Sequence, residues 1–490
     1  MEFTNKYYDA IVIGSGPNGL SCAIALAQKG LSVAVVEKFA TVGGGTRTQE
    51  LTLPGFLHDV CSAVHPLAVA SPFFKSLPLH EYGLKWLYPQ AEVAHPRDDG
   101  GVTLLKRSIV DTAKSFGRDQ SSYKSFFEPL VAQFDDLMTE ILAPPLHAPK
   151  HLSLLAKFGL NALLSANSFA RLHFREENTR ALFMGIAAHS AAPLTHFASS
   201  AAGLALHIAG HGSGWPIPEG GAKNISLALA SYFKSLGGEL VINREIQSLV
   251  ELPKSHGIFF DLTPRQILKI AGASLPKHIA QSLQKFQYGP GVFKMDWALN
   301  SPIPWKNPDC ALAGTVHLGG SSQEIIHSEN AVNAGILNAR PFVILSQPTL
   351  FDPTRAPSDL HIAWAYCHVP HGSNHDMRDT IENQIERFAP GFKKTILKSS
   401  CLFPKDLESR NPNLIGGDIS GGLVNARQIF FRPRLSLNPY RLTGPDDLSE
   451  DDRRQLWICS SSTPPGPGVH GMCGYHAAQR ALSQKMADIR

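Results

Sequence analysis

Three closely spaced glycines near the start of the chain, Gly14, Gly16 and Gly19, have the spacing of a phosphate-binding turn. The first permits a tight turn, the second lets a diphosphate approach the backbone, and the third lets a helix pack closely on a strand. The apolar run 8–13 precedes them, and a helical pattern of apolar residues over 20–27 follows. Because the N-terminus of a helix attracts anions, this order of elements predicts a nucleotide diphosphate site.

An acidic residue stands where the nucleotide ribose would be bound. The second apolar run, 31–36, predicts a strand that ends at Glu37. A carboxylate at this place can accept hydrogen bonds from both ribose hydroxyls, and it would repel a 2′-phosphate, which disfavours NADP. We expect further contacts with the nucleotide from Ser15, Pro17, Asn18 and Lys38.

A second glycine-rich segment, Gly43-Gly44-Gly45-Thr46-Arg47, follows Glu37 closely. It resembles a segment of flavoproteins in the amine oxidase and phytoene desaturase superfamily that runs beside the diphosphate and ribityl chain of FAD. The resemblance implies that FAD is the cofactor and that Gly44, Gly45, Thr46 and Arg47 contact it.

Two later segments also resemble that superfamily. We expect a strand over 237–246, and the resemblance implies that Ile246 touches the adenine end of FAD. A strand at 456–459 leads through a glycine-rich turn to a helix that we expect from Tyr475. A helix N-terminus at this place would stabilise an anionic reduced flavin. The resemblance implies that the turn holds the pyrimidine edge of the flavin through Gly468, Val469, Gly471 and Met472.

The amino-acid sequence is most similar to the phytoene desaturase-like branch of that superfamily, which includes retinol saturase-like proteins. The stretches that carry this resemblance are 261–265, 288–294, 364–370, 411–418 and 464–471. The resemblance covers nearly the whole chain and implies an α/β fold, in which a discontinuous Rossmann-type FAD-binding domain holds an inserted mixed β-sheet substrate domain and a helical cap. Only 14 residues separate Ile246 from Asp261, so the β-meander usual at that place is expected to be trimmed.

The expected domain boundaries follow from that order of segments. We assign 1–75, 211–290 and 413–490 to the FAD-binding domain, 76–210 to the helical cap and 291–412 to the substrate domain. Apolar and aromatic residues recur at helical spacing from about 120, and 181–210 contains no Asp, Glu or Lys and no Arg. This run predicts either buried helices or a surface that dips into a membrane, and with the aromatic helices it predicts a hydrophobic entrance to the site. In the substrate domain, runs at 292–299, 341–345 and 361–369 predict strands, and a helix with one buried face follows before Pro390.

Three residues are candidates for catalysis. Lys294 lies in a stretch that resembles the strand of amine oxidases in which a lysine points at the flavin, and on a strand it should face away from Phe293 and Met295. The alternative is a partly exposed lysine paired with an acid such as Asp296, two residues on and on the same face. His470 lies within the flavin motif, close enough to leave covalent attachment of the flavin open. Tyr366 is the third candidate, although its stretch is equally typical of a sheet core or a pocket wall.

Several other kinds of protein are excluded by composition. The formal net charge is +4 without a basic run, so no nucleic acid partner is expected. Seven cysteines form no C-x-x-C pair, which argues against a disulfide relay and a thiolate zinc site, and the histidines match no standard metal spacing. With neither a leader nor an apolar run of membrane-spanning length, the chain is expected to be cytoplasmic, with a possible peripheral membrane contact and an oligomeric state that the sequence leaves open.

The function expected from these features is that of an FAD-dependent oxidoreductase. It would desaturate, saturate or isomerise a C–C bond of an apolar, isoprenoid- or carotenoid-like small molecule by hydride transfer. No second strand–glycine turn–helix unit occurs for a nicotinamide, so the electron acceptor is expected to be oxygen, a quinone or another carrier. Two alternatives stay open: a flavin amine oxidase that oxidises a C–N bond, and a non-catalytic flavoprotein with a regulatory or binding role.

Overall fold

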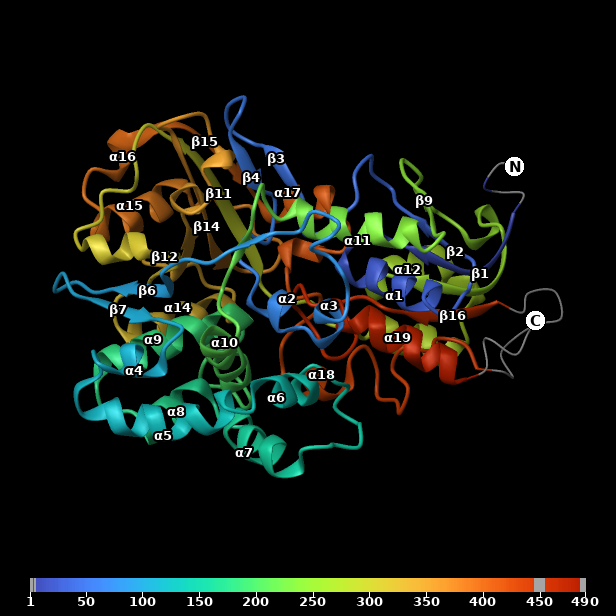
Figure 1. Cartoon of the computed structure of the whole chain (residues 1–490), viewed down its shortest axis with the longest axis horizontal. Coiled ribbons are helices and arrows are strands. Elements are labelled where there is room, and N and C mark those ends of the chain that lie inside the picture. Colours follow the sequence, from blue (N-terminus) through green and yellow to red (C-terminus); the bar gives the residue numbers. More distant parts are fainter. Residues whose placement is uncertain (1–2, 4–5, 445–453, 485–490) are drawn as a thin grey trace.

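The computed structural model describes residues 3, 6–444 and 454–484. Two large sheets organise the chain, a five-stranded one and a seven-stranded one. In Figure 1 the five-stranded sheet lies at the right, the seven-stranded sheet at the upper left, and a group of helices below it. No helix among these residues is long and apolar enough to cross a membrane.

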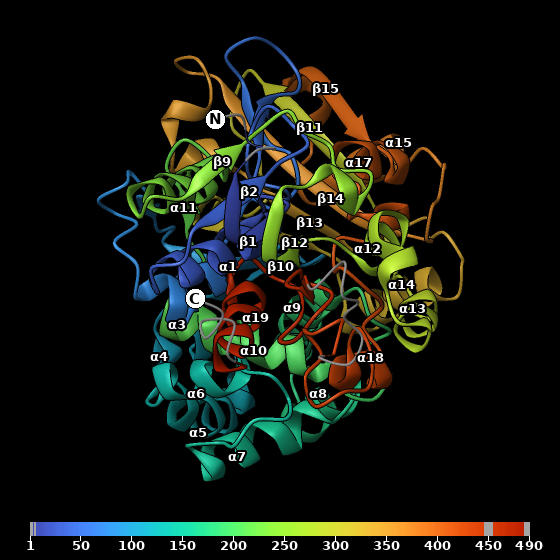
Figure 2. The same cartoon turned by 90° about the vertical axis from the view of Figure 1, so that its right-hand side faces the viewer.

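The five-stranded sheet is parallel throughout and has the order β16-β10-β1-β2-β9. Strands β9, β2, β1 and β10 lie side by side in Figure 2. Apart from the half-buried edge strand β9, its strands are largely buried, as the continuous apolar runs predict. One face packs on helices α1, α11 and α19, and the other on α12 and α13. The bounds are β1 Tyr7–Ile13, β2 Val33–Val36, β9 Glu239–Val241, β10 Lys254–Phe260, β16 Gln455–Ile458, α1 Pro17–Ala27, α11 Lys223–Ser235, α12 Pro264–Ala271, α13 Lys277–Gln284 and α19 Met472–Ser483.

The sequence predictions for two of these elements need correction. The strand expected over 237–246 is only three residues long, because the chain leaves the sheet edge after Val241. The helix expected from Tyr475 begins earlier, at Met472, where Gly471 in a left-handed conformation (φ 69°) forms its N-cap. No strand lies between Val241 and β10, in accord with the short interval before Asp261.

The seven-stranded sheet is mixed and has the order β15-β11-β14-β13-β12-β6-β7. Its central strands alternate faces: Phe293, Met295 and Trp297 point into one core with helix α15, while Lys294 and Asp296 point to the other side. The sequence predicted β11, β13, β14 and α15 but missed β12, β15 and α14. The bounds are β6 Ala91–Pro96, β7 Val102–Leu105, β11 Gly291–Leu299, β12 Ala313–Leu318, β13 Val343–Ser346, β14 His361–Val369, β15 Ile396–Leu402, α14 Ser322–Asn333 and α15 Arg378–Phe388.

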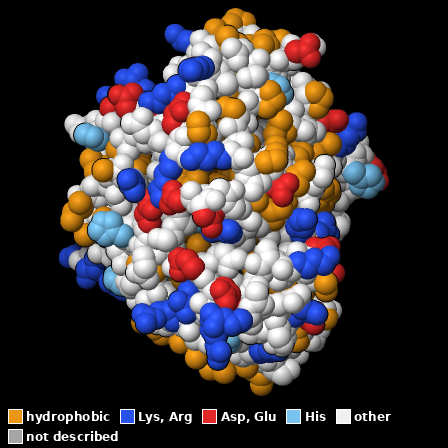
Figure 3. Space-filling model, turned by 90° about the vertical axis from the view of Figure 1, so that its left-hand side faces the viewer, with side chains coloured by type: hydrophobic (Ala, Val, Ile, Leu, Met, Phe, Trp, Pro, Cys, Tyr) orange, Lys and Arg blue, Asp and Glu red, His pale blue; other side chains and the backbone are white. Residues whose placement is uncertain are grey.

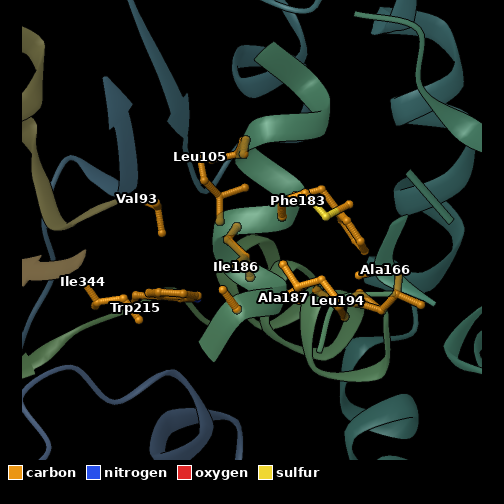
Figure 4. Close-up of a cluster of buried hydrophobic side chains, with 14 of the residues drawn as sticks. Val93, Leu105, Ala166, Phe183, Ile186, Ala187, Leu194, Trp215 and Ile344 are labelled. Atoms are coloured by element: carbon orange, nitrogen blue, oxygen red, sulfur yellow. The ribbon is translucent and has the colours of Figure 1, made fainter. Parts of the chain in front are cut away.

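The helical layer packs on the second face of this sheet. Figure 4 shows this cluster: Val93 and Leu105 of β6 and β7 lie on one side of α9, while Phe183 of α9 is directed to the other side, toward Ala166 of α8. The segment 76–210 is mostly helical, as expected for a cap, but it also supplies β6 and β7 to the seven-stranded sheet. The cap helices are α4 Ile109–Ala113, α5 Gln120–Val131, α6 Phe134–Ile141, α7 Leu152–Ala162, α8 Ala166–His173, α9 Glu177–Ala187 and α10 Ser200–Gly212.

Short elements connect the sheets and the cap. Two small antiparallel ladders pair β3 with β4 and β5 with β8. The bounds are β3 Thr48–Glu50, β4 Leu57–Asp59, β5 Trp86–Leu87, β8 Ile217–Pro218, α2 Pro66–Ala70, α3 Pro72–Lys75, α16 Phe392–Thr395, α17 Pro404–Arg410 and α18 Ala426–Phe431.

Candidate functional site

One cavity of about 870 Å³ runs through the molecule from the glycine turn after β1 to the cap helices. Its volume is at the upper end of the range for pockets that enclose small molecules. The predicted nucleotide segments 14–18, 37–38 and 44–47 line it, and so do 468–470 from the turn before α19. Segments far apart in the sequence therefore meet around a single cavity.

The first glycine turn has the backbone that its sequence predicts. Gly14 adopts φ 102°, a value that favours glycine. Gly44 approaches the same turn so closely that a Cβ on it would lie 3.2 Å from Gly16 Cα, and nothing lies within 4 Å of the place where Gly45 would carry a Cβ. The turn and the second glycine segment thus leave a narrow space with backbone on both sides. Gly19 does not reach the cavity and instead allows α1 to pack closely, since Gly14 O would touch its Cβ.

Glu37 joins the two glycine segments. Its carboxylate accepts hydrogen bonds from Ser15 N (3.1 Å), Ser15 Oγ (2.6 Å) and Phe39 N (3.0 Å). Arg47 Nη2 lies 3.3 Å from the same carboxylate, and the Arg47 guanidinium stacks on the Phe39 ring. Thr46 turns back on its own segment and bonds Gly43 O at 2.8 Å. Glu37 is therefore both a cavity wall and the group that holds Ser15 and Arg47 in place.

A second carboxylate, Asp261 at the end of β10, lies under the turn. It accepts the Gly19 N–H at 3.0 Å, lines the cavity and is buried. Burial, reinforced by the charge of Glu37, raises the pKa of Asp261 to about 7. Asp261 was not predicted as a site residue from the sequence. A strand end beside the glycine turn is the signal that could have identified it.

The adenine end of the expected cofactor site is more open. Lys38 Nζ pairs with Glu245 Oε1 at 2.9 Å, and both side chains are partly exposed. Arg244 and Ile246 complete this part of the wall; Ile246 is not on a strand, and its contact with adenine stays a prediction. Glycine backbone for a diphosphate, a carboxylate for a ribose and an apolar side chain for adenine fit FAD as a group that this cavity would hold.

The C-terminal turn supplies the opposite wall. Gly468, Val469 and His470 line the cavity, whereas Gly471 and Met472 lie behind them. The Met472 N–H donates to His470 Nδ1 at 3.0 Å, and burial lowers the pKa of His470 to about 4. His470 is therefore neutral with its Nδ1 as an acceptor, and its Nε2 carries the proton. Gly474 lets α19 touch α1 at Asn18 O, which fixes this turn against the glycine turn.

Tyr366 and Trp364 form the floor of the cavity on the seven-stranded sheet. Their rings lie 5.2 Å apart at 80°. Burial raises the pKa of Tyr366 far above its usual value, so this phenol stays protonated and can act only as a neutral donor or acceptor.

Lys294 lies beside this floor on the same face of the sheet, but it is not among the residues that line the cavity. It is opposite Tyr366 in the β11–β14 ladder, its Nζ is 5.8 Å from the centre of the Trp364 ring, and it forms a fully buried ion pair with Asp296. His58 Nδ1 lies 3.4 Å from the other Asp296 oxygen. Burial lowers the pKa of Lys294, and the Asp296 carboxylate opposes that shift. The expected pairing with Asp296 is thus present, but Lys294 is buried and not partly exposed, and its role in a reaction stays a prediction.

A pair of histidines that the sequence analysis did not single out adjoins the same floor. His189, between α9 and α10, lines the cavity, and its Nε2 lies 2.8 Å from His317 Nε2 on β12. Burial lowers the pKa of His189 to about 3, with a smaller contribution from His368. His368 in turn lies 2.7 Å from the buried Glu329 carboxylate. The available signal was a histidine inside the run 181–210, which has no Asp, Glu, Lys or Arg.

The cysteines take no part in a disulfide. All seven are free, and Cys61, which lines the cavity, has a pKa raised to about 11 by burial. Among the described residues no group of three or more His, Cys, Asp or Glu side chains is placed to hold a metal ion.

Comparison with known proteins places these observations in a family context. Residues 12–77 match a family model described as an NAD(P)-binding Rossmann-like domain. The chain is 26% identical over 559 residues to pyridine nucleotide-disulfide oxidoreductase domain-containing protein 2 of Rattus norvegicus, with 96% of this chain and 92% of the relative covered. It is 22% identical over 301 residues to the lycopene-forming phytoene desaturase of Pseudescherichia vulneris, with 56% of each chain covered.

The fold has neighbours among solved structures. Wild-type putrescine oxidase bound to putrescine aligns with 99% of this chain and 100% of its own, with a TM-score of 0.62 and 18% identity. The chain is thus similar in sequence to an oxidoreductase domain-containing protein and to a phytoene desaturase, and it shares the fold of putrescine oxidase, with a Rossmann-like nucleotide-binding part that fits FAD.

Proposed function

We propose that the protein is an FAD-dependent oxidoreductase that forms, removes or shifts a C–C double bond in an apolar, isoprenoid-like molecule. The observation that carries this proposal is the composition of the cavity beyond the flavin motifs. Its far end is lined by Leu155, Phe158 and Ala162 of α7 and by Ala201, Ala205 and Leu206 of α10. A wall of this kind desolvates and binds hydrocarbon and offers little to a polar substrate.

The residues that would hold FAD are those of the two glycine segments, Glu37, Ile246 and the turn 468–470. FAD, when bound, supplies the two-electron acceptor or donor of the reaction. The neutral Nε2–H of His470 is available as a hydrogen-bond donor on the cavity wall, and the N-terminus of α19 adds a positive dipole end behind it. Both features favour negative charge at this wall.

The transfer of a hydride from one carbon requires that a proton leave or reach the neighbouring carbon. His189 is the cavity-lining imidazole best suited to that task. It is neutral, it can pass a proton to His317, and its Nδ1 makes no hydrogen bond to another described residue. In the desaturating direction His189 would accept the proton while the hydride leaves the substrate; in the saturating direction the two transfers reverse.

The electron acceptor proposed is oxygen, a quinone or another carrier. Among the described residues, one glycine turn of the dinucleotide-binding type occurs, after β1 of the parallel sheet. We assign this turn to FAD, because the turn before α19 lines the same cavity. This leaves no second nucleotide domain there for a bound nicotinamide.

Product analysis tests the proposal against its two rivals. Purified holoprotein is incubated with isoprenoid hydrocarbons, isoprenoid alcohols and aliphatic amines, and the products are identified by mass spectrometry. A change of two mass units, or an isomer, in an isoprenoid supports the proposal. Aldehyde and ammonia from an amine would instead identify an amine oxidase, and no turnover of any class would favour a non-catalytic flavoprotein.

A further inference from the structure

One part of the cap carries large apolar side chains on its outer surface. Leu152 and Leu160 of α7 are 68% and 72% exposed, and Leu163 and Phe197 are also exposed. Phe197 lies beside Leu163, because the N–H of Ala198 donates to Leu163 O at 3.0 Å. We name Leu152, Leu160, Leu163 and Phe197 the apolar rim. Large apolar side chains gathered in this way mark an interaction surface.

The apolar rim borders an opening of the cavity. Leu163 belongs both to the rim and to the cavity wall, and Pro145, before α7, is likewise exposed and lines the cavity. Leu155 and Phe158 of α7 line the interior. Helix α7 therefore carries apolar side chains on its cavity side and on its solvent side. A soluble surface helix needs only the first of these.

The charged side chains of the segment that carries α7 have one sign. Residues 141–175 contain no Asp or Glu, and they include Lys150, Lys157, Arg171 and Arg175. The three carboxylates on the preceding helix α6 are already paired, Asp135 with Lys75, Asp136 with His151 at 3.5 Å and Glu140 with His147 at 2.5 Å. The face shown in Figure 3 is different, because acidic and basic side chains are mixed over it.

A second wall segment repeats this combination. In α18, Ile429 and Phe430 line the cavity, and the exposed Leu435 and Leu437 follow. Residues 426–441 contain four arginines and no acidic residue. In Figures 1 and 2, α18 lies at the same end of the molecule as the cap helices α6 and α7.

We propose that the apolar rim docks on an anionic lipid bilayer. The apolar side chains would enter the boundary between headgroups and acyl chains, while Lys150 and Lys157 would lie near the anionic headgroups. An apolar substrate could then pass from the bilayer into the cavity without crossing water. This last step rests on the proposed function; the docking does not, and it is measured without substrate.

Vesicle flotation of the holoprotein tests the docking. The probes are vesicles of phosphatidylcholine alone and vesicles in which phosphatidylserine makes up about a third of the lipid. The wild type is expected to float with the mixed vesicles, less with phosphatidylcholine alone, and less as salt is raised, since salt screens the attraction. Leu152→Ser/Leu160→Ser, whose side chains do not line the cavity, should weaken binding to mixed vesicles at least tenfold. Val250→Ser/Ile336→Ser, two exposed apolar residues elsewhere, is the matched control and should bind as the wild type does.

Two results would overturn the docking. One is equal flotation of the wild type and Leu152→Ser/Leu160→Ser, or no flotation of the wild type at all. The other is a dimer of the wild type, seen by analytical ultracentrifugation without lipid, that the same double substitution dissociates; the rim would then bind a second copy of the chain. Absorbance of bound FAD reports that each variant is folded. Turnover of an isoprenoid in detergent without vesicle binding would remove the docking and leave the proposed function standing.

Discussion

His189 Nε2 and His317 Nε2 lie 2.8 Å apart, so that one buried imidazole donates a hydrogen bond to the other next to the apolar cavity. Burial lowers the pKa of both rings, and each is therefore neutral at physiological pH. A neutral pair of this kind can take up one proton and share it. We propose that this pair receives the proton that leaves the substrate beside the hydride transfer.

His189→Leu is expected to slow flavin reduction by substrate about 10²-fold or more, since that is the usual contribution of a general base. FAD content should not change, because the residues assigned to FAD lie elsewhere along the cavity. His196→Leu, an exposed histidine of the same segment, is the control. Single-turnover kinetics make the measurement, and equal rates for the two variants would remove His189 from the reaction.

Asp261→Asn should remove a pH dependence from FAD binding. The pKa of Asp261 is raised to about 7, so the group is neutral below neutral pH and charged above it. A charged Asp261 repels the diphosphate, and the dissociation constant of FAD is therefore expected to increase as the pH rises through 7 in the wild type. In Asp261→Asn the rise should be absent, while the side chain can still accept the Gly19 N–H. Fluorescence titration with FAD across this pH range gives the result, and parallel curves would contradict the assignment.

The same carboxyl affects stability, with a definite sign. Because the folded protein keeps the proton to a higher pH than the unfolded chain does, the stabilisation from Asp261 is complete at acidic pH and is lost as the pH rises toward 7. The free energy of unfolding of the apoprotein should fall over this interval in the wild type and fall less in Asp261→Asn. Urea denaturation at several pH values measures the difference. An identical pH dependence of the free energy of unfolding in both proteins would show that the pKa of Asp261 is not raised in the folded protein.

Glu37→Ala should weaken FAD binding by about 1.5–3 kcal/mol, the range for hydrogen bonds to a charged group. The loss also frees Ser15 and Arg47, which Glu37 holds at 2.6 and 3.3 Å. Glu245→Ala, a partly exposed carboxylate at the same end of the cavity, is expected to change the affinity much less. Equal losses of FAD affinity in the two variants would show that any carboxylate at this end of the cavity contributes, and not a specific contact between Glu37 and the ribose.

Lys294→Met is expected to keep FAD but to slow substrate oxidation or flavin reoxidation at least tenfold, about 1.4 kcal/mol of barrier. It should also destabilise the fold by about 3–5 kcal/mol, because Asp296 is left buried without its partner. Lys294→Met/Asp296→Leu removes both charges and should recover most of the stability without recovering the rate. If Lys294→Met showed wild-type rates in both half-reactions, Lys294 would have a structural role only.

The nucleotide half of the site was predictable because its chemistry is local in the sequence. Gly14, Gly16 and Glu37 lie within one strand–turn–helix–strand unit, and they line one cavity. The strand alternation that separates Lys294 from Phe293 and Met295 was predictable for the same reason. His189 and His317 were not, because 128 positions separate them and only the packing of the cap on β12 brings them together. Tertiary pairing also determined whether Lys294 faced the cavity or Asp296, which spacing alone left open.

Anaerobic rapid mixing tests the central claim most directly. The oxidised holoprotein is mixed with an isoprenoid series and, separately, with amines and with reduced nicotinamides, and the absorbance of the flavin is followed in time. The account predicts loss of the oxidised flavin band with at least one apolar isoprenoid, or, for a saturating enzyme, reoxidation of chemically reduced flavin by that compound. Reduction by amines only, with no response to any isoprenoid in either redox state, would contradict it.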